Sequence, residues 1–187
     1  MPDWKILLQE HGPAVWRTAF RLLANHADAD DCYQETFADA LRRTRSDQRP
    51  IENWHAFLVR LATARSIDRL RERMRRTSKE RPTDDMRSHI DADRQSSPQT
   101  RAEDAEQAAK LRMIIARLPP KQADAFCLHC LEGWSYLEVG KCLGISTDHV
   151  GILISRARAA LREHLAAVLS KESLAELSTK AKAKVLP

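Results

Sequence analysis

A polar stretch in the middle of the chain separates two segments whose apolar residues recur at helical spacing. Residues 77–104 contain two prolines and no sustained apolar period. A stretch of that composition cannot bury enough apolar surface to fold by itself. We therefore predict two folded units, residues 1–76 and 105–169, joined by a flexible linker over residues 77–104. A tail, residues 170–187, either forms one more helix or frays.

Composition and spacing favour helices in both units. Glycine is scarce, with 5 in 187 residues, and aromatic residues make up 5%, which disfavours a sheet protein. Before the linker, the pattern predicts two helices joined at residues 25–31, a polar break at 45–53 and a long helix over 54–76. After it, a helix stops at the proline pair 119–120 and a second bundle follows. The expected fold is all-α, with two small helical bundles.

The chain carries no sign of export or membrane insertion. Its first residues, MPDWKILLQE, lack the profile of a signal peptide, and no apolar run approaches the roughly 18 residues of a membrane span. We expect a cytoplasmic protein. Its cysteines lie within helical patterns, where a reduced thiol acts as a small buried hydrophobe, so a disulfide framework is not expected. They are Cys32, Cys127, Cys130 and Cys142.

The second unit contains the outline of a helix-turn-helix. Ser135 and Glu138 have the spacing of a capping box, and Gly144 is suited to end the helix that starts there. Ser146 then offers a cap for the next helix. Two helices joined by a short turn that contains glycine, the second of them basic, are typical of DNA-binding proteins.

The helix after Ser146 has distinct apolar and polar sides. Val150, Ile154 and Ala157 fall on one side, which predicts that this side packs on the bundle. The outward side is then free to contact base edges or phosphates in a major groove, although an ordinary solvated helix face shows the same pattern. The candidate DNA-binding residues are Thr147, Asp148, His149, Ile152, Ser155, Arg156 and Arg158.

The long helix of the first unit is strongly basic. Residues 60–81 contain nine arginines or lysines and three carboxylates. Arginines repeat at spacings of three and four, opposite the apolar positions of the helix, and such a stripe can follow a phosphate backbone with salt-sensitive affinity. These are Arg65, Arg69, Arg73 and Arg76. The alternative is a solvated face that Asp68 and Glu72 partly neutralise.

Three stretches together resemble extracytoplasmic-function sigma factors of the sigma-70 family. They are ADADDCYQETFADALRR from Ala27, FLVRLATARSIDRLRER from Phe57, and LPPKQADAFCLHCLEGWSYLEVGKCLGISTDHV from Leu118. The resemblance implies a factor that carries RNA polymerase to particular promoters and helps to open the DNA there. It implies no enzymatic activity, no cofactor and no small-molecule substrate.

The first stretch resembles the family's acidic helix that docks on the coiled coil of the polymerase largest subunit. By this resemblance the polymerase-binding residues are Asp30, Asp31, Gln34, Glu35 and Phe37. Acidic and amide groups suit a basic partner surface. Read without the resemblance, the same carboxylates are an acidic helix start stabilised by the helix dipole.

The second stretch is similar to the helix that meets the minus-ten element, so the arginine stripe is assigned to that element. The preceding loop, residues 45–53, matches the place where the family captures a flipped-out base, which adds Asn53 and Trp54 to the site. Binding an extruded base joins recognition and strand separation in one event. Ala64 replaces an asparagine that is common in the family, so preference at this element is expected to differ.

The third stretch resembles the domain that reads the minus-thirty-five element and touches the polymerase flap. Gly151 and Ile152 occupy positions where the family often has lysine or arginine and serine, which leaves fewer hydrogen-bonding groups toward the DNA. By the same resemblance the linker threads the polymerase channels, an anti-sigma factor is an expected partner, and acidic linker residues mimic nucleic acid charge. Those residues are Asp84, Asp85, Asp91 and Asp93.

Other classes of function fit less well. Cys127, His129 and Cys130 lie close together, but their spacing is not that of a structural zinc site, so no metal is expected. No phosphate loop, nucleophile elbow or metal-binding His-Glu helix is present in the sequence. The alternatives that remain are a helix-turn-helix regulator that binds duplex DNA without polymerase and a helical interaction protein with solvated basic faces.

Overall fold

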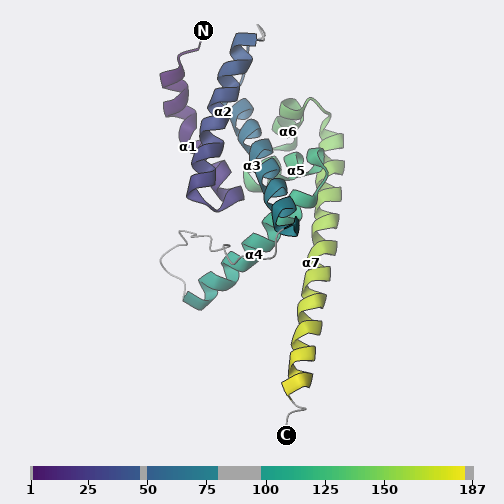
Figure 1. Ribbon diagram of the computed structural model, residues 1–187. Coiled ribbons are helices and arrows are strands. Elements are labelled where there is room, and N and C mark those ends of the chain that lie inside the picture. Colours follow the sequence, from purple (N-terminus) through teal and green to yellow (C-terminus); the bar gives the residue numbers. More distant parts are fainter. Residues whose placement is uncertain (1, 47–49, 80–97, 184–187) are drawn as a thin grey trace.

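The computed structural model describes residues 2–46, 50–79 and 98–183, and its elements in this part of the chain are all helical (Figure 1). The all-α prediction is confirmed. The acidic linker residues assigned to the polymerase channels lie outside the described residues. The helices are α1 (Trp4–Leu23), α2 (His26–Ser46), α3 (Trp54–Lys79), α4 (Pro98–Arg117), α5 (Pro120–Phe126), a π-helical turn η1 (Cys127–Leu131), α6 (Tyr136–Leu143) and α7 (Thr147–Ala183).

The connection between α1 and α2 is shorter than the predicted residues 25–31. Ala24 ends α1 in the left-handed region, with φ of 51°, and its N–H donates to the Phe20 carbonyl. The Asn25 side chain then accepts a 3.0 Å hydrogen bond from the Asp28 N–H. Because Asn25 caps the next helix directly, α2 starts at His26.

Three helix ends also differ from the predicted unit boundaries. Helix α3 extends to Lys79 and α4 starts at Pro98, so helices enter the predicted linker from both sides. Helix α7 continues to Ala183, into the predicted tail. The chain has neither glycine nor proline between Gly151 and Pro187, so nothing local ends that helix.

None of the described helices combines the length and apolar character that a membrane crossing requires.

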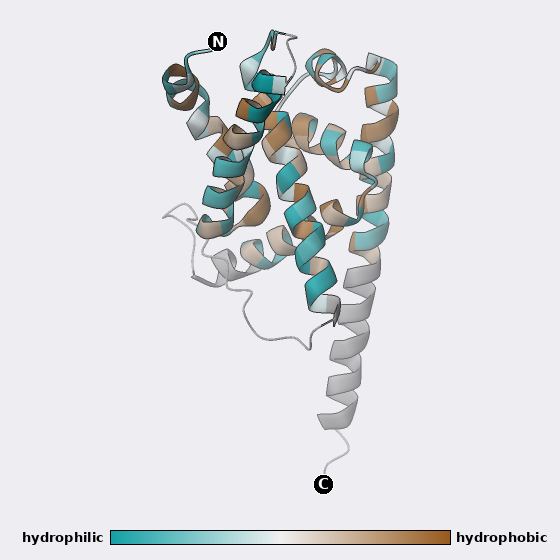
Figure 2. Ribbon diagram, turned by 45° about the horizontal axis from the view of Figure 1, so that its top comes forward, coloured by the Kyte–Doolittle hydropathy of each residue, from teal (hydrophilic) through white to brown (hydrophobic). Residues whose placement is uncertain are grey.

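Helix α3 lies between the two bundles and belongs to the core of both. On one side, Leu58 and Ala62 pack with Val15 and Phe37 of α1 and α2. On the other, Val59 joins a cluster built mainly from α5, α6 and α7. Figure 1 shows α3 between α1 and α2 on one side and α5 to α7 on the other, and in Figure 2 hydrophobic residues gather where helices face one another. The predicted bundles therefore contact each other, which the sequence pattern did not indicate.

Arginines of the first bundle bind main-chain carbonyls of the second. The Arg71 guanidinium donates to the carbonyls of Ala116 (3.1 Å) and Leu118 (3.0 Å), at the end of α4. Arg60 donates to the Cys142 carbonyl at 3.0 Å. These carbonyls lie at or near helix ends, where they lack hydrogen-bond partners within the helix. The helix dipole also stabilises a cation at that position. The contact between the bundles is thus polar as well as apolar.

A half-buried carboxylate in this contact gives a pH-dependent prediction. Burial raises the pKa of Asp124 above its ordinary 3.8, although Arg60 and Arg71 oppose this rise and Asp68 adds to it. Because the pKa is raised in the folded state, the ionised Asp124 lowers the free energy of unfolding at pH values above that pKa. This destabilisation disappears as the pH falls toward 3.8. We expect Asp124→Asn to unfold at a higher temperature than the wild type at pH 7. The gain should shrink as the pH is lowered toward 4, and a pH-independent difference would contradict this account.

Candidate nucleic-acid interface

Local capping interactions build the helix-turn-helix of α6 and α7. The Ser135 hydroxyl accepts from the Glu138 N–H at 3.2 Å, and the Glu138 carboxylate accepts from the Ser135 N–H at 2.8 Å. The Ser135 hydroxyl also donates to the Glu138 carboxylate at 2.7 Å, and this bond, followed by the bond from the Ser135 N–H, lowers the pKa of Glu138. Gly144 ends α6 in the left-handed region, with φ of 67°, and Ser146 accepts from the His149 N–H at 3.3 Å. The predicted capping box, glycine stop and second cap are confirmed.

Helix α7 buries one face and exposes the other over its first turns. Val150, Ile154 and Ala157 are buried in the clusters that hold the second bundle together. The seven candidate DNA-binding residues are all exposed. An open groove runs along this exposed face, and most of the candidates line it. Its lining consists of Tyr136, Thr147, Asp148, Gly151, Ile152, Ser155 and Arg156. His149 lies outside the groove, as does Arg158, whose guanidinium is 3.6 Å from the Cys130 sulfur.

Gly140 sets the close approach between α6 and the turn. A Cβ at this position would lie 2.8 Å from the Ile145 carbonyl oxygen, which is main chain and cannot rotate away. We expect Gly140→Ala to lower the free energy of unfolding by about 1–3 kcal/mol, measured by urea denaturation. Gly151→Ala is the matched control, because its Cβ would meet only the Tyr136 ring, at 3.5 Å. That control should be neutral or stabilising, since alanine is the better helix former; equal losses in both variants would contradict the packing argument.

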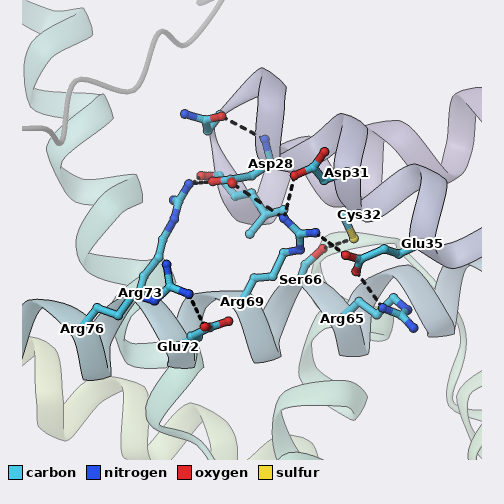
Figure 3. A network of polar contacts seen from close by, with 12 residues as sticks. Asp28, Asp31, Cys32, Glu35, Arg65, Ser66, Arg69, Glu72, Arg73 and Arg76 are labelled. Atoms are coloured by element: carbon cyan, nitrogen blue, oxygen red, sulfur yellow. Dashed lines mark hydrogen bonds and ion pairs between the residues drawn. The ribbon is translucent and has the colours of Figure 1, made fainter.

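Three of the four stripe arginines, Arg65, Arg69 and Arg73, pair with carboxylates of the acidic helix α2 (Figure 3). Arg69 lies at the centre of this network, 2.8 Å from Glu35, 3.5 Å from Asp31 and 3.7 Å from Asp28. Arg65 contacts Glu35 at 2.7 Å and also pairs with Asp39, and Arg73 pairs with Asp28. The stripe and the acidic helix, two separate predictions from the sequence, therefore form one ion-pair network.

The network neutralises most of the charge that the sequence assigned to the stripe. Arg76 at its end pairs with Glu72, and Asp68 pairs with Arg71, as the solvated-face interpretation anticipated. The groove between α2 and α3 contains both signs of charge in nearly equal number. It is lined by Asp28, Asp31, Glu35, Asp39, Leu61, Arg65, Asp68, Arg69, Glu72, Arg73, Arg75 and Arg76. A role for the stripe in DNA binding stays a prediction, and it now requires these pairs to open.

The candidate polymerase-binding residues of α2 divide into surface and core positions. Asp30, Asp31, Gln34 and Glu35 are exposed. Phe37 is instead 7% exposed, in the core cluster of the first bundle. Asp30 accepts a 2.6 Å hydrogen bond from the Trp16 indole, which fixes one edge of the acidic surface. In this arrangement Phe37 supports the helix from beneath, and the carboxylates form its outer face.

The candidate base-capture residues hold the start of α3. The Asn53 side chain accepts from the Ala56 N–H at 2.9 Å and so caps the helix. The Trp54 ring packs edge-on against Trp4 at a centroid distance of 5.8 Å and is partly buried. Residues 47–49 of the preceding loop lie outside the described part of the chain. Both residues therefore have structural contacts, and their role toward DNA stays a prediction.

The three side chains considered as metal ligands, Cys127, His129 and Cys130, lie in different environments. Cys127 is buried, and burial raises the pKa of its thiol. Cys130 is exposed, and His129 Nδ1 lies 2.7 Å from the Trp134 carbonyl. Within the described residues, no three His, Cys, Asp or Glu side chains are grouped so as to hold a metal ion.

Several residues of these two surfaces were not among the candidates predicted from the sequence. Asp28 and Asp39 complete the ion-pair network, and Tyr136 lines the groove beside the second helix of the helix-turn-helix. A signal for the first two was present, because the acidic positions of α2 repeat at three- and four-residue spacing, as the arginines of α3 do. Tyr136 carries no such signal, since its position depends on how α6 crosses α7.

The fold and the exposed second helix define a two-bundle, all-α protein of the helix-turn-helix class. Residues 7–76 match the family model for sigma-70 region 2, and residues 108–161 match that for sigma-70 region 4. The sequence is 35% identical over 167 residues to the ECF RNA polymerase sigma factor SigE of Mycolicibacterium smegmatis, covering 89% of this chain and 63% of that protein. It is 28% identical to the RNA polymerase sigma factor CarQ of Myxococcus xanthus, covering 85% and 87% of the two chains.

A solved structure shows the same fold. The sigma factor RpoE of Bartonella quintana, crystallised with the anti-sigma factor NepR, aligns with a TM-score of 0.55 at 22% identity, over 88% of this chain and 98% of that one. The chain belongs to the sigma-70 family, in its extracytoplasmic-function group.

Proposed function

We propose that this chain binds core RNA polymerase in the cytoplasm, directs it to specific promoters and promotes opening of the DNA. The single observation that carries most weight is the exposed face of α7, where a well-packed helix presents Ser155, Arg156 and their neighbours along an open groove. A helix held rigidly on its buried side and open on the other suits insertion into a major groove. Family membership supplies the polymerase as partner.

The polymerase contact in this proposal is the outer face of α2. Asp31 and Glu35 are 63% and 48% exposed, so a basic partner surface can reach them although both contact Arg69. Complementary charge sets the orientation of such a contact. Because the same carboxylates neutralise the arginine stripe, a partner that binds them competes with α3 and leaves Arg65 and Arg69 available to phosphates. Polymerase binding and promoter binding would then favour each other.

Strand opening in this proposal uses binding free energy alone. Arg65, Arg69, Arg73 and Arg76 contact the minus-ten region, and Asn53 and Trp54 lie beside the captured base, while the exposed residues of α7 contact the minus-thirty-five region. No nucleotide hydrolysis is needed if the site binds only an extruded base. An anti-sigma factor is proposed as a further partner, since RpoE of Bartonella quintana was crystallised with one.

Reconstituted transcription tests this function. Purified core polymerase is combined with the chain on fragmented bacterial DNA, and transcript starts are mapped against a reaction without the chain. We expect new, discrete starts that share two upstream sequence elements. A core enzyme that elongates normally from a preassembled primer-template scaffold but gives no discrete starts with the chain would refute the proposal.

A further inference from the structure

We propose that Ile152 reads the methyl groups of thymines in the promoter's upstream element, so that recognition there depends on an apolar contact. This inference rests on the proposed function and adds to it the chemical feature that α7 selects. It starts from an aliphatic residue in the middle of a face that is otherwise polar.

The exposure of Ile152 sets it apart from the other aliphatic residues of α7 nearby. Val150, Leu153 and Ile154 are 0%, 5% and 1% exposed, whereas Ile152 is 50% exposed. Ile152 also belongs to none of the core clusters formed by the described residues. Packing of the second bundle therefore does not account for an isoleucine at this position.

The residues around Ile152 form a shallow, partly apolar surface. Gly151 has no side chain, so the adjoining surface of the helix stays open, and the Tyr136 ring lies close enough that a Cβ on Gly151 would be 3.5 Å from it. Tyr136 is itself 38% exposed. Asp148 and Arg156, one turn before and one turn after, lie on the same face as Ile152. Polar groups thus flank an apolar centre within one groove.

Base edges in the major groove offer one strongly apolar group, the C5-methyl of thymine. A branched aliphatic side chain gains by burying that methyl. Against the other base edges it would leave donors or acceptors without a partner, which is unfavourable. The departures at Gly151 and Ile152 from the family's usual polar residues therefore replace hydrogen bonding with selection for a methyl group.

Uracil substitution tests this contact without changing base pairing. Polymerase reconstituted with the full chain is bound to a promoter fragment taken from the transcript map, with thymine or uracil in the upstream element, one strand at a time. Burying about one CH₂ equivalent contributes about 0.8 kcal/mol, which predicts about fourfold weaker binding for each contacted methyl that is removed. Uracil placed in the downstream duplex, outside both elements, should have no effect.

Two variants assign the effect to Ile152. Ile152→Ala should bind the thymine and uracil promoters equally. Leu137→Ala removes a similarly exposed aliphatic residue, 56% exposed on α6 but outside the groove, and should keep the full fourfold difference. Full discrimination in Ile152→Ala overturns the inference. So does a wild-type holoenzyme that forms specific complexes and binds both promoters equally. A holoenzyme without any specific promoter complex overturns the proposed function instead, and the inference with it.

Discussion

Arg69→Glu is expected to lower the free energy of unfolding by about 1–3 kcal/mol, between the ranges for an exposed and for a buried ion pair. Arg69 is 23% exposed and lies among Asp28, Asp31 and Glu35, so the change removes their shared partner and adds a fourth negative charge. A domain with a total stability of about 5–15 kcal/mol would lose a large part of it. Urea denaturation followed by circular dichroism measures the loss.

Two further variants separate the ion-pair network from a general effect of charge. Arg76→Glu makes the same charge change at a residue that is 72% exposed and pairs with Glu72, and should cost about 1 kcal/mol or less. Adding Glu35→Arg to Arg69→Glu restores one pair of opposite charges and should recover part of the stability. If Arg69→Glu were no worse than Arg76→Glu, the network would not hold α2 on α3.

The double change Asp31→Asn and Glu35→Gln is expected to weaken association with core polymerase by about tenfold or more, or about 1.4 kcal/mol. Both substitutions keep the size of the side chain and remove its charge, and with it the attraction to a basic partner surface. Fluorescence anisotropy of a labelled chain titrated with core polymerase gives the dissociation constant. Weaker binding at higher salt in the wild type, and a shallower salt dependence in the variant, should accompany the change.

Stability has to be measured beside affinity in this experiment, because both residues also pair with Arg69. Glu163→Gln is a suitable control, since it neutralises an exposed carboxylate on α7, away from α2. A folded double variant that binds core polymerase as tightly as the wild type would remove Asp31 and Glu35 from the interface.

The parts of this structure that depend on local interactions could be predicted from the sequence. The capping box of Ser135 and Glu138 and the glycine stop at Gly144 involve residues close in the chain, so spacing alone identifies them. The exposed face of α7 follows in the same way from helical periodicity. These features are sufficient to place Ile152 on the exposed face of α7, although not the Tyr136 ring beside it.

The features that could not be predicted from the sequence depend on residues far apart in the chain. Arg65 and Arg69 lie 30 and 34 residues from Glu35, and nothing in the pattern of α3 says which helix its cations face. The burial of Val59 against the second bundle is equally non-local. A helix packed between two bundles has the same sequence pattern as a helix that buries one face and exposes a basic face to solvent. The sequence therefore predicts two units and a linker but does not indicate whether the units touch.

The affinity of the isolated chain for its promoter, compared with that of the chain bound to core polymerase, tests the central claim most directly. With α2 carboxylates occupying the arginines of α3, the account predicts weak and poorly selective DNA binding by the isolated chain, and at least tenfold tighter, promoter-selective binding by the holoenzyme at the same salt concentration. Tight, sequence-specific binding by the isolated chain that core polymerase does not improve would contradict the account and would support an independent helix-turn-helix regulator.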